Sequence, residues 1–340
     1  MKDCSLAVVG ASGMVGHVIM QVLAERGFAG CKVYAVASPK SVGKQIEFAS
    51  RRVTLMSIED AINLHPHYAI FSAGASVSKQ YAPQFAAIGT TVIDNSSAWR
   101  MDPSIPLVVP EINMHTVSSD SRIIANPNCS TIQMVLALSR LHVRYRIRRL
   151  VISTYQSVTG SGQRAYEQLC AEEKGDTIPV TSRSYPYPIH RNVFPHGGDF
   201  LPDNYTTEEQ KLVDETRKIL GDNQILISAT VARIPVVGGH SESVNVEFHE
   251  EFDISEVQQI LTNTEGVVLY DNPSRNLYPM PILSEGHDEV FVGRVRRDFS
   301  QPKTLNLWIT ADNLRKGAAT NAVQILQRLL EVNQGKDFDL

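Results

Sequence analysis

Residues 5–16 read Ser5-Leu-Ala-Val-Val-Gly10-Ala-Ser-Gly13-Met-Val-Gly16, a short apolar run that leads into three glycines at intervals of three residues. Apolar residues then recur at helical spacing as far as Gly27, which predicts a strand, a tight turn and a helix. The backbone N–H groups at the start of such a helix can hold a pyrophosphate. A glycine-rich turn can also be a plain tight connection, and GxxGxxG is not GxGxxG, so this turn alone leaves dinucleotide binding open.

The pattern of apolar residues along the chain predicts two kinds of sheet. Further short apolar runs occur at residues 32–37, 68–71, 91–93 and 122–125, separated by polar or amphipathic stretches. Strands that alternate with helices predict an α/β domain, a mostly parallel, doubly wound sheet of the Rossmann type. From about Arg148 the strands alternate as half-buried strands do, for example at 244–248 and 305–309. We therefore expect a second, α+β domain on a largely antiparallel sheet with helices on one face.

The chain of 340 residues is long for one core and favours two domains. We place the dinucleotide-binding domain at residues 1–127, completed by a closing C-terminal helix in 313–340, and the second domain at 128–312. A net charge of −4 with scattered Lys and Arg argues against a nucleic-acid partner. No apolar run approaches the roughly 20 residues that cross a bilayer, so we expect a cytoplasmic protein without a membrane partner.

Four cysteines show neither metal-ligand spacing nor disulfide density, so no metal site is expected. A lone cysteine is most often a small buried apolar side chain, and we apply that interpretation to Cys4, Cys31 and Cys170. Cys129 differs, because polar residues flank it in Asn126-Pro-Asn-Cys-Ser-Thr131, between a predicted strand and a predicted helix. A helix N-terminus favours the nucleophilic thiolate, and its N–H groups can stabilise an oxyanion, so Cys129 is a candidate acylation site.

The end of the second predicted strand bears on the choice of cofactor. An NAD site expects Asp or Glu there, but this chain reads Ala37-Ser-Pro-Lys-Ser41. Ser38, Ser41 and Lys40 could accept a 2′-phosphate instead, which favours NADP over NAD. An exposed polar turn is the alternative interpretation.

With these motifs in order, the chain resembles the aspartate-semialdehyde dehydrogenase family over nearly its whole length. The segments that carry the resemblance are residues 10–16, 72–77, 92–100, 109–111, 126–133, 153–156, 233–235, 239–243 and 312–319. The resemblance implies the fold of glyceraldehyde-3-phosphate dehydrogenases, with a catalytic and dimerisation domain, and a homodimer or homotetramer. It also implies reversible NADPH-dependent reductive dephosphorylation of L-4-aspartyl phosphate to L-aspartate 4-semialdehyde and phosphate through a thioester. The reaction serves the biosynthesis of lysine through diaminopimelate, and of methionine, threonine and isoleucine.

The resemblance assigns roles to individual residues. The catalytic residues are Cys129, His240 as the acid/base and Gln156, which orients the acyl group; the substrate-binding residues are Arg100 for phosphate, Glu208 for the amino group, Lys211 for phosphate and Arg233 for the α-carboxylate. The expected NADP contacts are Gly10, Ser12, Gly13, Met14, Val15, Gly16, Ser38, Lys40, Ser41, Ser72, Gly74, Asn95, Pro188 and Asn313. Read without the family, Arg233 could equally form a structural salt bridge, Glu208 and Lys211 a solvated pair three residues apart, and Gln156 a local backbone contact.

Gly238 and Gly239 precede His240, and their bare backbone is expected to let substrate approach. Two departures from the family pattern, at residues 192–198 and at Lys40, where many members carry arginine, leave cofactor preference and subunit contacts open. A related thioester-forming reductase, such as an N-acetylglutamyl-phosphate or acyl-CoA reductase, is one alternative; its substrate would offer Glu208 no amine. A catalytically silent relative is another, against which the presence of Cys129 and His240 argues.

Overall fold

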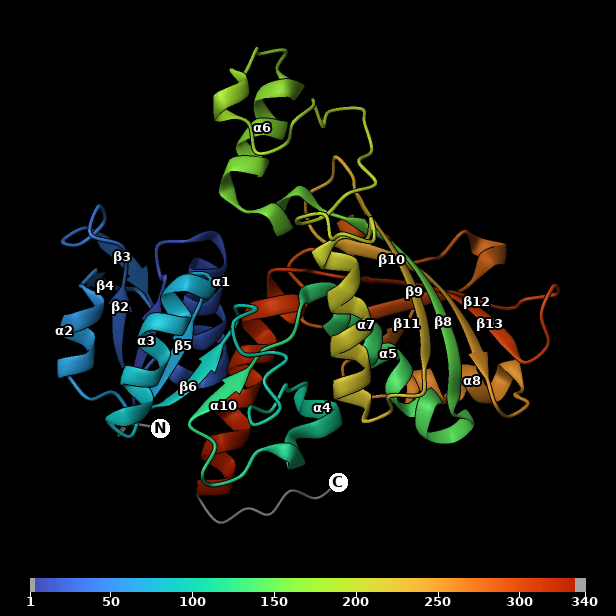
Figure 1. The fold of residues 1–340 in the computed structure, drawn as a ribbon, viewed down its shortest axis with the longest axis horizontal. Coiled ribbons are helices and arrows are strands. Elements are labelled where there is room, and N and C mark those ends of the chain that lie inside the picture. Colours follow the sequence, from blue (N-terminus) through green and yellow to red (C-terminus); the bar gives the residue numbers. More distant parts are fainter. Residues whose placement is uncertain (1–3, 334–340) are drawn as a thin grey trace. The chain divides into compact units, whose positions relative to one another are not determined.

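The computed structural model describes residues 4–333, and the chain divides into two compact units (Figure 1). The first unit joins Met1–Asn128 to Ala318–Leu340, and the second is Cys129–Gly317. The expected first boundary thus lies one residue earlier than the observed one, and the expected return to the first domain at residue 313 lies five residues early. Residues 1–3 and 334–340 of the expected segments lie outside the described residues.

A five-stranded parallel sheet forms the centre of the first unit, as the sequence predicts. Its order is β2 (Lys32–Val36), β1 (Ser5–Val9), β5 (Tyr68–Phe71), β6 (Thr91–Asp94) and β7 (Ile123–Ala125). Apolar residues of one face pack against α1 (Met14–Leu23) and α10 (Thr320–Asn333). The other face packs against α2 (Ile58–Asn63) and α3 (Ala75–Ala87). The sheet is therefore covered on both sides, as in a doubly wound domain.

Smaller elements complete the first unit. They are a hairpin of β3 (Gln45–Phe48) and β4 (Arg51–Thr54), and the short α4 (Pro110–Asn113). The predicted helix at 13–26 is observed as α1 followed by a π-helical turn, Ala24–Phe28, and Gly27 adopts a left-handed φ of 87° at its end. The closing helix starts later than expected, because a π-helical segment, Arg315–Ala319, precedes α10.

The second unit holds a six-stranded mixed sheet. Its order is β11 (Val267–Leu269), β12 (Val290–Arg297), β13 (Thr304–Ala311), β10 (His240–Phe248), β8 (Ile147–Gln156) and β9 (Leu226–Arg233). The three central pairings are antiparallel, but β8 pairs with β9 and β11 pairs with β12 in parallel. The expected sheet was largely antiparallel; its outermost pairs differ because helical crossovers return the chain in the same direction.

Helices α5 (Cys129–Tyr145), α7 (Thr207–Leu220) and α8 (Ile254–Thr262) pack on the sheet of the second unit. Short α9 (Pro281–Ser284) lies next to β13, and α6 (Gln163–Glu173) belongs to the long connection between β8 and α7 (Figure 1). The residues predicted to point inward, at 244, 246 and 248 and at 305, 307 and 309, are all buried. None of the helices in residues 4–333 is both long and apolar enough to span a bilayer.

Two glycines of the first turn are required by close backbone contacts. Gly10 has φ +92°, and a Cβ there would lie 2.4 Å from the Ser72 carbonyl oxygen. A Cβ on Gly16 would lie 2.1 Å from the Gly10 carbonyl oxygen. The backbone of α1 therefore lies so close to the turn that only glycine fits at position 16.

We therefore expect Gly16→Ala to push α1 away from the turn and to lower the free energy of unfolding by roughly 1–3 kcal/mol, the usual cost of overpacking. Gly30→Ala is the matched control, because no heavy atom lies within 4 Å of its added Cβ. The control should change stability by less than about 1 kcal/mol. Denaturant unfolding measures both variants, and equal stability of the two would contradict the close contact.

Candidate active site

Cys129 is the first residue of α5 in the second unit. It is only partly buried, whereas its neighbours Asn128 and Ser130 are buried. No acidic residue occurs in the first turn of α5, so the positive end of the helix dipole is not offset there. A Cβ on residue 317 would lie 2.8 Å from the Cys129 Cβ. Only glycine at position 317 therefore leaves room for the Cys129 side chain.

The other cysteines have different surroundings. Cys4 and Cys31 are buried, as predicted, and burial raises the pKa of the Cys4 thiol to about 12. Such a thiol is inert at neutral pH. Cys170 was expected to be buried as well, but it is only partly buried. It lies on α6, a helix of which few residues are buried. Exposure alone therefore does not single out Cys129; its place at a helix start does.

Three of the predicted residues form a row across the sheet beneath α5. Gln156 on β8 pairs with Arg233 on β9, and the β8–β10 register, which pairs Tyr155 with Ser241, places His240 opposite Gln156 one residue further on. Paired residues point to the same face of a sheet. Arg233, Gln156 and His240 thus stand side by side, and all three are at most 5% exposed.

One hydrogen bond to His240 determines which of its ring nitrogens carries the proton. The Ser157 backbone N–H donates to Nδ1 at 3.0 Å, so Nδ1 is unprotonated and the neutral ring carries its hydrogen on Nε2. Nε2 is buried and has no hydrogen-bond partner among residues 4–333. Burial, and secondly the Arg233 charge, hold the pKa of His240 well below its ordinary value. The ring is therefore neutral at neutral pH and can donate a hydrogen bond from Nε2.

Arg233 and His240 face one glycine. A Cβ on Gly160 would lie 2.7 Å from Arg233 Nη1 and 3.0 Å from His240 Nε2, and Gly160 itself is exposed. Nη1 also donates to the Ser157 carbonyl at 2.7 Å, which fixes the guanidinium. The room expected at Gly238 and Gly239 is different: their missing Cβ atoms face Glu285, Ser284 and Ala311. The expectation that these two glycines open the site is therefore wrong, since protein atoms fill the space beside them.

Gln156 connects the row to α5, the helix that begins at Cys129. Its Nε2 donates to the Ser130 hydroxyl at 3.0 Å, and Ser130 directly follows Cys129 in the first turn of α5. A chain of contacts thus links the central residue of the row to the residue next to the sulfur.

Glu208 and Lys211 lie on α7 and are hydrogen-bonded to each other. Thr206 and Glu209 cap the helix, and the Val231 N–H of β9 donates to Glu209 at 3.0 Å, which ties α7 to that strand. A Cβ on Gly197 would lie 2.7 Å from Val231 and 3.1 Å from the Glu208 side chain. Glu208 therefore lies close to β9, on the face that also carries Arg233, and it is more buried than a solvated surface pair requires.

The first unit contains a pocket of about 780 Å³ at the glycine turn. Of the expected cofactor contacts, five line it: Gly10, Ser12, Gly13, Ser38 and Ser72. Met14, Val15, Gly16, Lys40, Ser41, Gly74 and Asn95 belong to the same unit but are not among its lining residues, while Pro188 and Asn313 belong to the second unit. Lining residues that the sequence did not indicate include Glu59, which accepts a hydrogen bond from Tyr81 at 2.8 Å.

Arg100 also lies in the first unit. It is buried, 7% exposed, and its Nη2 donates to the Asn95 carbonyl at 2.7 Å. Within residues 4–333 no group of three or more His, Cys, Asp or Glu side chains is arranged to hold a metal ion.

Several residues at the site carried no signal in the sequence. Ser157 contacts His240 from 83 positions away, and Gly160 and Gly317 are contacts that only the folded chain defines. The serine in the first turn, Ser130, and the buried Glu242 lie in quoted motifs, but nothing in those motifs separates them from their neighbours.

Residues 5–119 match the family described as semialdehyde dehydrogenase, NAD binding domain, and residues 138–316 match semialdehyde dehydrogenase, dimerisation domain. The chain is 47% identical over 333 residues to the aspartate-semialdehyde dehydrogenase of Aquifex aeolicus, covering 96% of this chain and 98% of that one. It is 44% identical to that of Legionella pneumophila, with 96% of both chains covered.

Among solved structures, aspartate semialdehyde dehydrogenase II of Vibrio cholerae complexed with ASA superposes with a TM-score of 0.93 at 38% identity, covering 97% of this chain and 99% of that one. The Candida albicans aspartate semialdehyde dehydrogenase, solved with NADP, superposes with a TM-score of 0.76 at 22% identity and covers 97% and 99% of the two chains. At that identity it shows the fold alone.

Proposed function

The chain belongs to the aspartate-semialdehyde dehydrogenase family of oxidoreductases, which serve amino-acid biosynthesis, and on that premise we propose that it works through a thioester on Cys129. The reaction is the reversible conversion of L-4-aspartyl phosphate to L-aspartate 4-semialdehyde and phosphate, with NADPH as the reductant. One observation carries the proposal: a partly exposed cysteine begins a helix above a buried row of Arg, Gln and His.

In this proposal Cys129 attacks the acyl carbon as a thiolate and expels phosphate. The N-terminus of α5 favours the thiolate, and its N–H groups can stabilise the negative oxygen of the tetrahedral intermediate. The helix carries no acidic residue in its first turn that would oppose either effect. Bound NADPH supplies the hydride that reduces the thioester.

His240 assists at the reacting oxygen. Its Nε2–H can donate a hydrogen bond to the oxygen of the tetrahedral species formed on Cys129 and so stabilise the negative charge there; the neutral ring keeps its single proton, and that oxygen exchanges its proton with solvent. Ser157 keeps Nδ1 as an acceptor and so holds this tautomer. Gln156 lies between His240 and Arg233, and its hydrogen bond to Ser130 keeps its amide turned toward the acyl group.

Charged side chains of the two units match the charges of aspartyl phosphate. Arg233 binds the α-carboxylate, since a guanidinium grips a carboxylate with two parallel hydrogen bonds. Glu208 binds the α-ammonium, and Lys211 and Arg100 bind phosphate. An N-acetylated substrate would offer the Glu208 carboxylate no ammonium group, and an acyl-CoA carries no acyl phosphate for Lys211 and Arg100 to bind, so these alternatives fit the residues less well.

The first unit fits a dinucleotide, and we propose NADP(H). Gly10 and Gly16 are required by close backbone contacts within the turn, and Ser12 and Gly13 are exposed at the start of α1, where a pyrophosphate can bind. Ser38 follows β2, where an acidic residue would select NAD. Lys40 and Ser41 stand in the same turn and would reach a 2′-phosphate. The Glu59 carboxylate is held by Tyr81, which fixes where it stands in the pocket.

Replacing the nucleophile tests the proposal directly. We expect Cys129→Ala to reduce turnover of aspartate semialdehyde, phosphate and NADP to below roughly 10⁻⁴ of the unaltered rate, because no thioester can form. NADPH binding, measured by titration calorimetry, should remain. Cys170→Ala is the control, since Cys170 lies on α6 and has no proposed role. Substantial turnover by Cys129→Ala would end the thioester proposal.

Substrate recognition gives a second test. Arg233→Leu should raise KM for aspartate semialdehyde about 10- to 100-fold, since a charge-assisted hydrogen bond is worth about 1.5–3 kcal/mol. Arg144→Leu is the matched control, because Arg144 is exposed and pairs with Glu256 at the far end of α5. Steady-state kinetics distinguish the two. An unchanged KM in Arg233→Leu would remove Arg233 from the substrate site.

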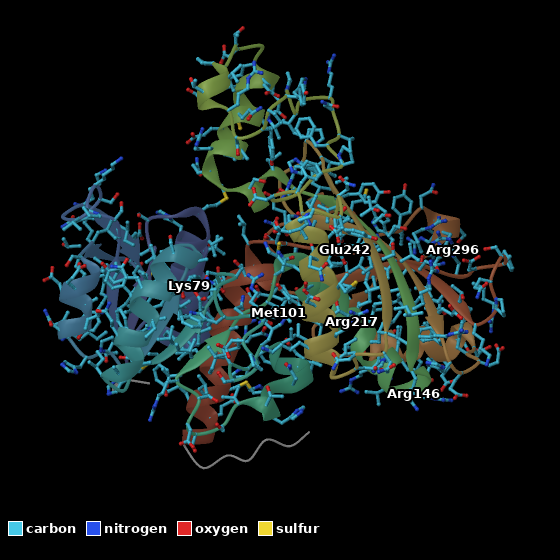
Figure 2. All side chains as sticks on the ribbon, viewed as in Figure 1. Lys79, Met101, Arg146, Arg217, Glu242 and Arg296 are labelled. Atoms are coloured by element: carbon cyan, nitrogen blue, oxygen red, sulfur yellow. The ribbon has the colours of Figure 1, made fainter. Side chains whose placement is uncertain are left out.

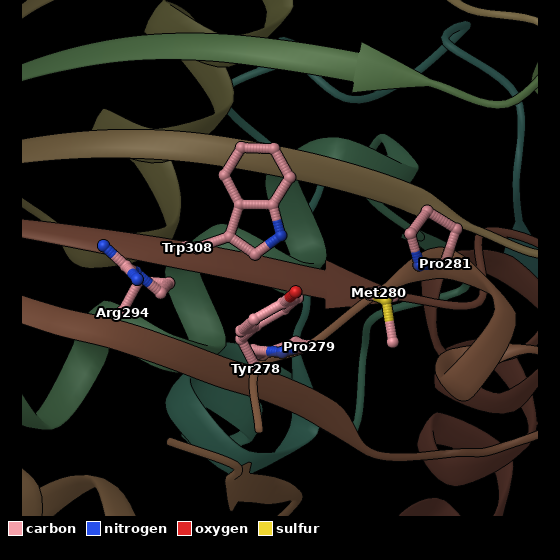
Figure 3. A pocket seen from close by; sticks show the side chains of 6 residues that line it. All are labelled: Tyr278, Pro279, Met280, Pro281, Arg294 and Trp308. Atoms are coloured by element: carbon pink, nitrogen blue, oxygen red, sulfur yellow. The ribbon is translucent and has the colours of Figure 1, made fainter. Parts of the chain in front are cut away.

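The second unit matches a dimerisation domain, and we propose a homodimer, or a tetramer built from such dimers, that uses the outer face of the six-stranded sheet. Alternate residues of β8, β10 and β13 are only partly buried on this face, among them Tyr155 and Trp308, whose rings are 5.4 Å apart. Figure 3 shows the adjoining hollow of about 440 Å³, which is lined by Tyr278, Pro279, Met280, Pro281, Arg294 and Trp308. A partly exposed sheet face that carries two aromatic rings, beside a hollow lined mostly by apolar residues, suits contact with a second copy.

Trp308→Glu should therefore shift the protein toward monomers, because it places a charge on the proposed contact. Sedimentation equilibrium measures the mass, and Val143→Glu on the exposed side of α5, where Val143 is 83% exposed, should leave the mass unchanged. A Trp308→Glu protein that assembles like the unaltered chain would place the contact elsewhere.

A further inference from the structure

A second polar row lies directly behind the row that contains His240. Glu242 pairs with Thr154 on β8, and Thr154 pairs with Val231 on β9. Because residues two apart on a strand share a face, Glu242 points the same way as His240, toward α5. Figure 2 labels Glu242 within the sheet of the second unit. The acidic side chain is thus two residues further along β10 than His240.

Glu242 is 0% exposed, and the polar side chains around it are also buried. Neither carboxyl oxygen meets a partner at hydrogen-bonding geometry within the described chain, and the same is true of both side-chain polar atoms of Gln133 and of the Thr154 hydroxyl. Burial raises the pKa of the Glu242 carboxyl well above its ordinary value. The nearby Gln133 amide and Ser130 hydroxyl act in the opposite direction, but their effect is smaller. Natural cores seldom keep several buried polar groups together unless these groups serve one another or a site.

The buried polar groups around Glu242 suit an un-ionised carboxylic acid at this position but not a carboxylate. A buried carboxylate without a cation costs several kcal/mol, whereas an un-ionised acid needs only one donor and one acceptor nearby. Gln133 offers both in one amide, and Ser130 offers a hydroxyl. Arg233 acts on His240 but is not among the groups that act on Glu242.

Ser130 joins the second row to the first. Its hydroxyl oxygen accepts the hydrogen bond from Gln156 at 3.0 Å, and the same hydroxyl lies close enough to the Glu242 carboxyl to lower its pKa. Gln133 lies one helical turn further along α5, on the same side of the helix. Glu242 therefore faces two side chains at the start of α5, and one of these, Ser130, also holds Gln156.

We propose that Glu242 is an un-ionised positioning residue that fixes the first turn of α5, and with it Cys129 and Gln156, through Ser130 and Gln133. The inference rests on the proposed thioester function, but it concerns how the nucleophile is held and not which substrate it attacks. Glu242 touches none of the reacting atoms in this account.

Two substitutions distinguish an un-ionised Glu242 from an ionised one and from a residue that only fills the core. Glu242→Gln keeps a neutral donor and acceptor, and Glu242→Leu removes both at similar volume. We expect Glu242→Leu to lower kcat about tenfold or more with KM changed by less than about twofold, and Glu242→Gln to restore kcat to within about threefold. Glu250→Gln, at an exposed position just beyond the end of β10, is the control. Full kcat in Glu242→Leu, or an equal loss in Glu242→Gln, would overturn the proposal.

Alkylation of Cys129 by iodoacetamide, followed peptide by peptide in a mass spectrometer, gives a readout without turnover. Glu242→Leu should slow it severalfold, and Glu242→Gln should leave the rate unchanged. Faster alkylation in Glu242→Gln would reveal that a negative charge had been removed and would contradict an un-ionised Glu242. If Glu242→Leu fails to fold, Ser130→Ala interrupts the same chain by one atom, and unchanged kcat and alkylation in Ser130→Ala would equally overturn the proposal.

Unfolding at two pH values tests the protonation itself. The folded chain keeps the Glu242 proton while the unfolded chain loses it above the ordinary pKa, so the contribution of Glu242 to stability is complete at low pH and declines as pH rises. Gln cannot ionise, so the stability of Glu242→Gln relative to the unaltered chain should increase from about pH 5 to about pH 8. A constant or falling difference would contradict it. The alkylation and unfolding experiments need no activity, so a failure of the proposed reaction would appear separately, in the Cys129→Ala comparison.

Discussion

The register of three strands determines which side chains meet at the start of α5. Because β8 pairs with β9 in parallel and with β10 in antiparallel, Gln156 has Arg233 on one side and His240 on the other. A slip of one residue in any of these strands would turn that strand's member of the row to the outer face of the sheet. Buried apolar residues of the same face, such as Ile152 and Val244, prevent that slip, since they would have to leave the core as well.

The burial that holds the register also sets the charges at the site. Removal from water disfavours any charged form, so it lowers the pKa of His240 and raises the pKa of Glu242. Both groups are then neutral at neutral pH, and the guanidinium of Arg233 stands beside them with its positive charge. An anionic substrate group approaching the row meets net positive charge, although one of the nearby side chains is acidic.

The sequence predicted local structure well, because the signals were local. The turn at Gly10 and Gly16, the helix that starts at Cys129 and the capped helix of Glu208 all follow from residues a few positions apart. The roles of His240 and Gln156 came from the family resemblance and not from their neighbours. Their adjacency depends on pairing between strands far apart in the chain, and no local pattern encodes it.

Other features escaped the sequence for the same reason. Glu59 lines the dinucleotide pocket from a helix that no cofactor motif includes, and the outermost strand pairs are parallel because of crossovers whose path the alternation of residues does not reveal. The error over Gly238 and Gly239 is instructive. A glycine next to a catalytic residue suggests room for substrate, but here both positions are needed by protein atoms, and the glycine that borders His240 and Arg233 is Gly160.

Gly160 and Gly317 keep the space beside the proposed nucleophile, Cys129, and beside His240 open. Cys129 is the partly exposed residue in a buried segment, and it is fixed by a helix start that the core holds in place. Any side chain at position 317 would press on the Cys129 Cβ, and any at position 160 would enter the space beside His240 Nε2 and Arg233 Nη1. Glycine costs about 0.5–1 kcal/mol of stability relative to alanine in regular structure. At these two positions glycine leaves space beside the Cys129 side chain and the His240 imidazole. In the proposed reaction a substrate needs that space, and this need offsets the cost in stability.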